Sequence, residues 1–130
     1  VTQTILKGAA KNKVRSIIVG GAASLLIPQS DGKTVLTTPN FLPASVVPIA
    51  RACNEQHKIV SAHIDSNWSY ACPPALIHPG MRTGKYRSGL DELLYDDEGQ
   101  SQISMEDFSL ALIDEAEQSN HTNKRFTVAY

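Results

Sequence analysis

The hydrophobic pattern of the chain is organised around residues 16–25, which read Ser-Ile-Ile-Val-Gly-Gly-Ala-Ala-Ser-Leu. Residues 17–19 are β-branched and apolar, without the alternation of a half-exposed strand. An unbroken apolar run is typical of a parallel strand that helices cover on both faces. Gly20 and Gly21 follow at once, where they permit a sharp turn or a close approach. The pattern predicts a strand buried on both faces. It leaves open whether the glycines merely end that strand or face a ligand at its carboxyl end.

Apolar positions recur with helical spacing in three stretches. Residues 2–13 carry an apolar stripe and end in lysines, which suit the negative end of a helix. Residues 44–64 form the second stretch, and an early proline indicates that its regular part begins near that residue. The third, residues 104–118, opens with Ser104, which can cap a helix in a capping box with Asp107. We therefore expect three helices.

Short apolar stretches predict strands at residues 68–72, 85–87 and 125–130, and a hairpin over residues 93–104. Two prolines end the first of these strands, because proline cannot donate to a sheet ladder. A long turn-rich loop, residues 27–43, follows the central strand. Alternating helices and strands predict an α/β fold with a largely parallel sheet. Two or three parallel strands make a thin sheet, so another chain or an N-terminal segment is expected to complete it.

Length and charge narrow the class of protein. The 130 residues suit a single domain, residues 1–130. A formal net charge of −1 with dispersed charges argues against a nucleic-acid partner. No apolar run is long enough to span a membrane and no export leader is visible, so we expect no membrane partner and a cytoplasmic location. Cys53 and Cys72 are isolated and expected to be reduced. The histidines lack the spacing of zinc ligands, so no metal site is expected.

Several segments in a fixed order resemble one protein family. They are Val19-Gly20-Gly21-Ala22-Ala23-Ser24-Leu25, Pro73-Pro74-Ala75, Arg82-Thr83-Gly84-Lys85-Tyr86-Arg87 and the tail from Ile103 through Val128. Together they are similar to the C-terminal part of the NAD(P)-binding, NmrA-like atypical short-chain dehydrogenases, a group described as NADH-flavin reductase-like or biliverdin-reductase-B-like. The resemblance covers essentially the whole chain and implies a partial Rossmann-like, doubly wound sheet. It also implies that the N-terminal βαβ unit with its phosphate loop is absent, and no such glycine-rich string occurs in the sequence.

The resemblance implies a nicotinamide cofactor, NADP or NAD, at two turns. The cofactor-binding residues would be Gly20, Gly21, Ala22 and Ser24 after the first strand, and Pro73, Pro74 and Ala75 after the second. Ser24 is the candidate catalytic residue, because a serine in this place often hydrogen-bonds the substrate carbonyl in such dehydrogenases. The helix that follows lacks their Tyr-x-x-x-Lys pair, so the acid that would protonate an alkoxide is not visible.

Three functions remain open. The first is an NAD(P)H-dependent reductase that passes hydride to a small-molecule acceptor, a flavin or a quinone, without a protein acid. The second is an NmrA-like sensor that binds dinucleotide and regulates a partner. The third is a structural remnant that pairs through an exposed sheet edge, as a homodimer or with another chain. Because the phosphate loop is absent, the isolated chain is expected to bind NAD(P)H weakly or not at all and to be weakly active or inactive.

Three cations, Arg82, Lys85 and Arg87, gather in one short segment outside these turns. They fit a phosphate or an acidic partner, and a solvated edge strand accounts for them equally well. The acidic residues 96–98 lack the alternating oxygen ligands of a calcium loop and are interpreted as a solvated turn.

Overall fold

The computed structural model describes the whole chain, residues 1–130. Its helices are α1 (Thr2–Asn12), α2 (Val47–Ser61) and α3 (Met105–Gln118), with the 3-10 turns η1 (Ala22–Ser24) and η2 (Ala44–Val46). Its strands are β1 (Ser16–Val19), β2 (Trp68–Cys72), β3 (Leu76–His78), β4 (Arg87–Gly89), β5 (Gln102–Ser104) and β6 (Lys124–Ala129). None of the helices is both long enough and apolar enough to cross a membrane.

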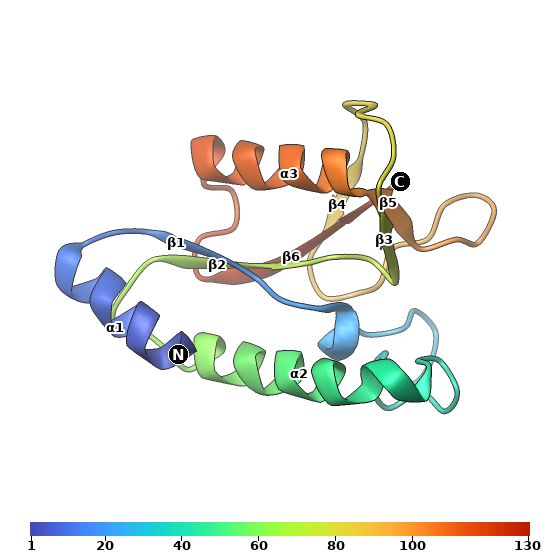
Figure 1. Cartoon of the computed structure of the whole chain (residues 1–130), viewed down its shortest axis with the longest axis horizontal. Helices are drawn as coiled ribbons and strands as arrows, with labels where there is room; N and C mark the ends of the chain where they lie inside the picture. Colours follow the sequence, from blue (N-terminus) through green and yellow to red (C-terminus); the bar gives the residue numbers. More distant parts are fainter.

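These elements form three layers (Figure 1). The middle layer is a four-stranded sheet with the order β1-β2-β6-β4, in which β1, β2 and β6 are parallel and β4 is antiparallel. Helices α1 and α2 lie below the sheet in this view and α3 lies above it. A two-stranded parallel sheet, β3-β5, lies near the end where β2 finishes. The arrangement confirms the predicted α/β fold with a largely parallel, partial Rossmann-like sheet.

The two faces of β2 belong to two hydrophobic cores. Trp68, Tyr70 and Cys72 pack on the α1 and α2 side, with Leu6 and Val60. The intervening Ala71 joins the core on the α3 side, whose other members are Ile103, Phe108, Ala111, Phe126 and Val128. This alternation follows from the two-residue period of a strand. All five residues of β2 are buried, so β2 is the strand that is covered on both faces.

Strand β1, predicted to be buried on both faces, is instead an edge strand. Val19 is 49% exposed, and the other three residues of β1 are only partly buried. β1 pairs with β2 alone, and α3 packs mainly against β5 and β6. The prediction for β1 is therefore wrong. An apolar run indicates that its side chains favour burial, but it does not identify the element of the fold that buries them.

The three predicted helices are confirmed, with ends close to those expected. α1 ends at Lys13, whose left-handed φ of 54° breaks the helix. α2 follows η2 and has Pro48 in its first turn, where proline is tolerated. α3 is capped by Ser104, whose hydroxyl accepts a hydrogen bond from the Asp107 N–H at 3.0 Å.

The predicted hairpin over residues 93–104 does not form. Its turn is present, since the Asp96 N–H donates to the Gln100 carbonyl oxygen at 2.8 Å. The flanks pair elsewhere: the Leu93 N–H donates to the Leu26 carbonyl oxygen at 2.8 Å, and β5 pairs in parallel with β3. The residue types in the turn produce the local bend, whereas tertiary packing determines which segments pair with the residues on either side of it. The short edge strand expected at residues 85–87 is present as β4, slightly later in the chain.

Candidate functional site

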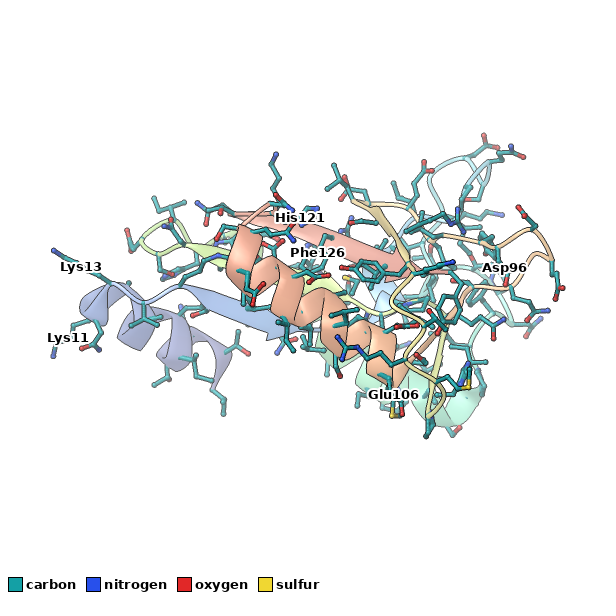
Figure 2. The ribbon with its side chains drawn as sticks, turned by 90° about the horizontal axis from the view of Figure 1, so that it is seen from above. Lys11, Lys13, Asp96, Glu106, His121 and Phe126 are labelled. Carbon is teal, nitrogen blue, oxygen red and sulfur yellow. The ribbon has the colours of Figure 1, made fainter.

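The two predicted cofactor turns follow neighbouring parallel strands. The Gly20 N–H donates to the Ala71 carbonyl oxygen at 2.9 Å and so extends the ladder between β1 and β2. Because the carboxyl ends of parallel strands meet at one edge, both turns lie at the same end of the sheet. Figure 2 shows Lys11 and Lys13 at the opposite end of the molecule from Asp96. Along the turns, Gly20, Gly21, Ala22, Ser24 and Pro73 are half-buried, Pro74 is buried and Ala75 is exposed.

Gly20 and Gly21 have a packing role. A Cβ atom at Gly20 would lie 2.0 Å from the Tyr70 hydroxyl oxygen, and one at Gly21 would lie 3.1 Å from Cys53 Sγ. Neither glycine has a positive φ, so backbone strain does not require them. Residue 20 must therefore lack a side chain for Tyr70 to keep its place. The two glycines follow the edge strand β1 and pack closely on β2 and α2.

Tyr70 lies against this turn but is enclosed. Its single hydroxyl hydrogen is shared between the Cys53 carbonyl oxygen at 3.0 Å and Gln56 Oε1 at 3.1 Å, and burial raises the pKa of Tyr70. The His57 ring packs on it with centroids 5.0 Å apart. Burial, and then the charge of Arg125, lower the pKa of His57. Both side chains are thus neutral near pH 7. Because the Tyr70 hydroxyl is buried and bonded to α2, it does not take the place of the tyrosine of the absent Tyr-x-x-x-Lys pair.

A guanidinium from β6 holds the Ser24 turn. Arg125 Nη1 donates to the Ser24 carbonyl oxygen at 3.0 Å and to its Oγ at 2.8 Å. Nε and Nη2 of Arg125 donate to Asp91 Oδ1 at 3.1 and 2.8 Å. Since Arg125 uses only the hydroxyl oxygen, Ser24 keeps its hydroxyl hydrogen to donate to another acceptor. Arg125 and Asp91 were missed by the sequence reasoning, because Arg125 lies 101 residues from Ser24 and no local pattern links them.

The first turn of α3 organises the loop that follows β3. Oδ2 of the buried Asp107 accepts from the hydroxyls of Thr83 and Tyr130 at 2.6 and 2.8 Å, and Oδ1 accepts from the Gly84 N–H at 2.9 Å. Burial alone would raise the pKa of Asp107, but these hydrogen bonds outweigh it and hold the pKa well below its ordinary value. The Ser104 N–H donates instead to the Tyr130 hydroxyl at 3.2 Å. Only half of the predicted capping box therefore forms.

Asp107→Asn is expected to loosen residues 80–86. The amide keeps the shape of the carboxylate, but it loses the charge and turns an NH₂ group toward donors. We expect a loss of about 2 kcal/mol of unfolding free energy, as for hydrogen bonds to a buried charge. Hydrogen exchange at the Thr83 and Gly84 amides should accelerate, whereas Asp97→Asn, at an exposed acid in a turn, should change neither quantity. Unchanged exchange at both amides would contradict the assigned role of Asp107.

The structure contains no group of three or more His, Cys, Asp or Glu side chains that could hold a metal ion. Cys53 and Cys72 are free thiols. Burial raises the pKa of Cys72 to about 12, so this thiol stays protonated and unreactive.

Comparison with known proteins defines the class. The chain has the fold of the C-terminal part of NAD(P)-binding, short-chain dehydrogenase/reductase-like proteins. No protein-family model matches it. Among curated proteins, it is 36% identical to the uncharacterised protein YwnB of Bacillus subtilis over 126 residues, which is 96% of this chain and 58% of YwnB. The chain thus spans less than two thirds of that relative.

Three solved structures superpose closely. A Burkholderia pseudomallei protein, provisionally named as exported, is 35% identical with a TM-score of 0.90, over 99% of this chain and 62% of its own. A Bacteroides thetaiotaomicron protein, provisionally named an epimerase, is 36% identical with a TM-score of 0.90, over 98% and 58%. A Streptococcus pneumoniae protein, provisionally named an NADH-flavin reductase, is 26% identical with a TM-score of 0.86, over 98% and 63%. A Veillonella parvula short-chain dehydrogenase/reductase in complex with NADP, 18% identical with a TM-score of 0.69, shares the fold.

Proposed function

We propose that this chain is part of an NAD(P)H-dependent reductase that passes hydride to a flavin-type or quinone-type acceptor in the cytoplasm. The observation that carries the proposal is the pair of adjacent turns at the carboxyl edge, one of which presents a Ser24 hydroxyl held by Arg125. Ligands of open α/β sheets bind at such an edge. The name of the Streptococcus protein supports a flavin acceptor, and the Veillonella complex supports NADP as the cofactor.

The residues present fit the nicotinamide end of the cofactor. When bound, NAD(P)H would supply the hydride, and a flavin or quinone that accepts it can take the balancing proton from water instead of from a protein acid. Ser24 would donate its hydroxyl hydrogen to the nicotinamide amide or to the acceptor, and Arg125 would keep that hydroxyl in place. The exposed Ala75 would lie along the ligand. This chain has no glycine-rich loop for the pyrophosphate, which therefore needs residues outside the 130 described.

The free edge of β1 is where we propose that further strands of the whole protein pair. This edge strand has no neighbour beyond it, and apolar side chains are exposed on it and close to it in sequence. Val19 is 49% exposed, Val14 is 56% and Ile5 is 55%. This chain matches 58% of YwnB and 58% of the Bacteroides protein, so each of these relatives has a further part. We propose that a corresponding part of the whole protein supplies these strands. A second copy of the chain pairing along β1 is the alternative, and it would be detected as a dimer in solution.

The 130-residue chain alone is expected to bind NADPH and NADH weakly, with dissociation constants well above the micromolar range, because the amides that hold a pyrophosphate are absent. A chimera that places the part of YwnB not matched by this chain before Val1 should bind far more tightly. Fluorescence titration of both proteins with both nucleotides measures the difference. Submicromolar binding by the 130-residue chain would contradict the expectation.

Turnover separates the reductase from a sensor. The chimera should oxidise NADPH or NADH in the presence of flavin mononucleotide, riboflavin or a soluble quinone. Ser24→Ala should slow this oxidation by on the order of tenfold, as for the loss of one ordinary hydrogen bond. Tight nucleotide binding without oxidation by any acceptor would favour the non-catalytic sensor. A folded chimera that neither binds nor oxidises NADPH or NADH would favour the structural module.

A further inference from the structure

An open cavity of about 320 Å³ lies beside the carboxyl end of β6, apart from the Ser24 turn. It is lined by Lys85, Tyr86, Arg87 and Tyr130. None of these residues belongs to the two cofactor turns. The cavity therefore combines two aromatic rings with two cations, a combination that suits a flat aromatic molecule carrying a negative charge.

Both tyrosine rings are fixed by carboxylates of α3. The Tyr86 hydroxyl donates to Asp114, and the Tyr130 hydroxyl donates to Asp107 at 2.8 Å. Burial, together with the Asp114 carboxylate, raises the pKa of Tyr86 to about 12, so this ring stays neutral. Each phenol donates its proton to a carboxylate of α3, so both hydroxyls are held there and the rings are left to line the cavity.

None of the cations beside the cavity, Arg82, Lys85 and Arg87, lies within ion-pair distance of an Asp or Glu side chain. The nearest carboxylate effect is that of Arg87, whose charge adds to the hydrogen bond from the Gln100 backbone in lowering the pKa of Asp96. Arg87 Nε donates to the Tyr130 carbonyl oxygen at 3.0 Å, and its Nη2 donates to the carbonyl oxygens of Tyr130 and Tyr95, so the guanidinium is fixed and only Nη1 is free to face a ligand. The side chains of Arg82 and Lys85 are exposed. The backbone that carries them is held: Asp107 binds the Gly84 N–H at 2.9 Å. A loop that is already ordered gives up less entropy when it binds a ligand.

The cavity is connected to the second cofactor turn through adjacent backbones. The Ala75 N–H donates to Ser101 Oγ at 3.2 Å, and the Leu76 N–H donates to the Ser101 carbonyl oxygen at 2.9 Å. On the other side of β5, the Tyr130 N–H donates to the Gln102 carbonyl oxygen at 3.1 Å. Hydrogen-bonded backbones lie about 5 Å apart, so Tyr130 is about 10 Å from the turn. A flavin with a phosphate-bearing side chain is long enough to reach from one to the other.

We propose that this cavity is the subsite for the anionic end of the hydride acceptor, with Lys85 and Arg87 facing its phosphate or carboxylate and the two tyrosine rings beside its aromatic part. The acceptor is then an aromatic anion of the flavin mononucleotide kind, rather than an uncharged quinone. That this ligand accepts hydride rests on the proposed function, whereas its binding as an anion does not depend on hydride transfer.

Binding of flavin mononucleotide by this chain, compared with riboflavin, tests the subsite directly, because the two probes differ only in the phosphate. Quenching of flavin fluorescence at low ionic strength should show flavin mononucleotide binding about five- to tenfold more tightly. Lys85→Gln should reduce that preference severalfold and leave riboflavin binding unchanged. Lys7→Gln, at an exposed cation on α1, is the matched control and should preserve the preference.

Equal binding of the two flavins, or a preference that Lys85→Gln leaves intact, would overturn the subsite. The reductase is assessed separately by nicotinamide oxidation in the chimera. A Lys85-dependent preference for flavin mononucleotide without any oxidation would support the subsite and count against the reductase. Oxidation with equal efficiency on both flavins, unchanged by Lys85→Gln, would support the reductase and overturn the subsite.

Discussion

Gly20→Ala is expected to destabilise the chain by about 3 kcal/mol or more, because the added methyl group would occupy the place of the Tyr70 ring. The new Cβ would lie 2.0 Å from the Tyr70 hydroxyl oxygen and 2.1 Å from its Cζ. Tyr70 is completely buried and bonded through its hydroxyl to α2, so it cannot move aside without breaking those bonds and opening the core. Urea denaturation of the variant and the parent measures the loss.

Gly8→Ala provides the matched control. A Cβ at Gly8, within α1, would meet no atom within 4 Å. This substitution should therefore stabilise the chain by about 0.5–1 kcal/mol, the usual gain when alanine replaces glycine in a helix. Tyr70→Phe should not rescue Gly20→Ala, since the Cζ and Cε1 atoms of the ring are also too close, at 2.1 and 2.4 Å. A Gly20→Ala protein as stable as the parent would show that the turn does not pack on Tyr70.

Glu115→Ala is expected to have the other large effect, a loss of about 3–5 kcal/mol, as when one partner of a buried ion pair is removed. The Glu115 side chain is 2% exposed and pairs with the Arg15 guanidinium. It also accepts from Ser69 Oγ at 2.9 Å, and His121 Nδ1 lies 2.7 Å from its other oxygen. His121 in turn stacks on Phe126 with centroids 4.6 Å apart, beside α3 (Figure 2). One carboxylate thus ties the amino ends of three strands to the last turns of α3.

The same network predicts sensitivity to acid. Burial alone would raise the pKa of Glu115, but hydrogen bonds from His121 and Ser69 outweigh it and lower the pKa below its ordinary value of 4.5. A carboxylate with a lowered folded-state pKa stabilises the fold fully above its unfolded value. That contribution is lost as the pH falls through the folded-state pKa. Stability should therefore decline below about pH 4.5.

Glu115→Gln should remove part of this acid-dependent loss, because the amide does not titrate in that range. Glu117→Gln, at an exposed residue of the same helix, should behave as the parent, within about 0.5 kcal/mol. Thermal unfolding from pH 7 down to pH 3 compares the three proteins. If Glu115→Gln and the parent lost the same amount of stability between pH 7 and pH 3, the lowered pKa of Glu115 would not contribute to the free energy of unfolding.

Several features follow from rules that act within a few residues, and these were predicted from the sequence. Ser104 caps α3, and Pro48 lies in the first turn of α2. The β-branched run at residues 17–19 lies in a strand, and glycines follow that strand. Each depends on backbone propensity or on a single local hydrogen bond. The resemblance to reductases also depended on short sequence motifs, which occur in a fixed order along the chain.

The errors have a common physical cause. Residues 93–104 contain good turn chemistry, yet β5 found its partner in β3, more than 20 residues earlier. Asp107 fits a capping box, but donors from Thr83, Gly84 and Tyr130 occupy its carboxylate. In each case a distant segment competed with the local partner and prevailed, because it offered more buried hydrogen bonds or apolar contact.

The sequence by itself determined the alternation of helices and strands, and hence two turns at one edge of a parallel sheet. Only the tertiary structure decided that β2, rather than β1, is covered on both faces, and that Tyr70 requires a glycine at residue 20. It also brought Arg125 to Ser24, and Lys85 to Tyr130. Backbone propensities act between near neighbours in the chain. Burial and hydrogen-bond partners depend on segments far apart in sequence, which meet only in the folded protein.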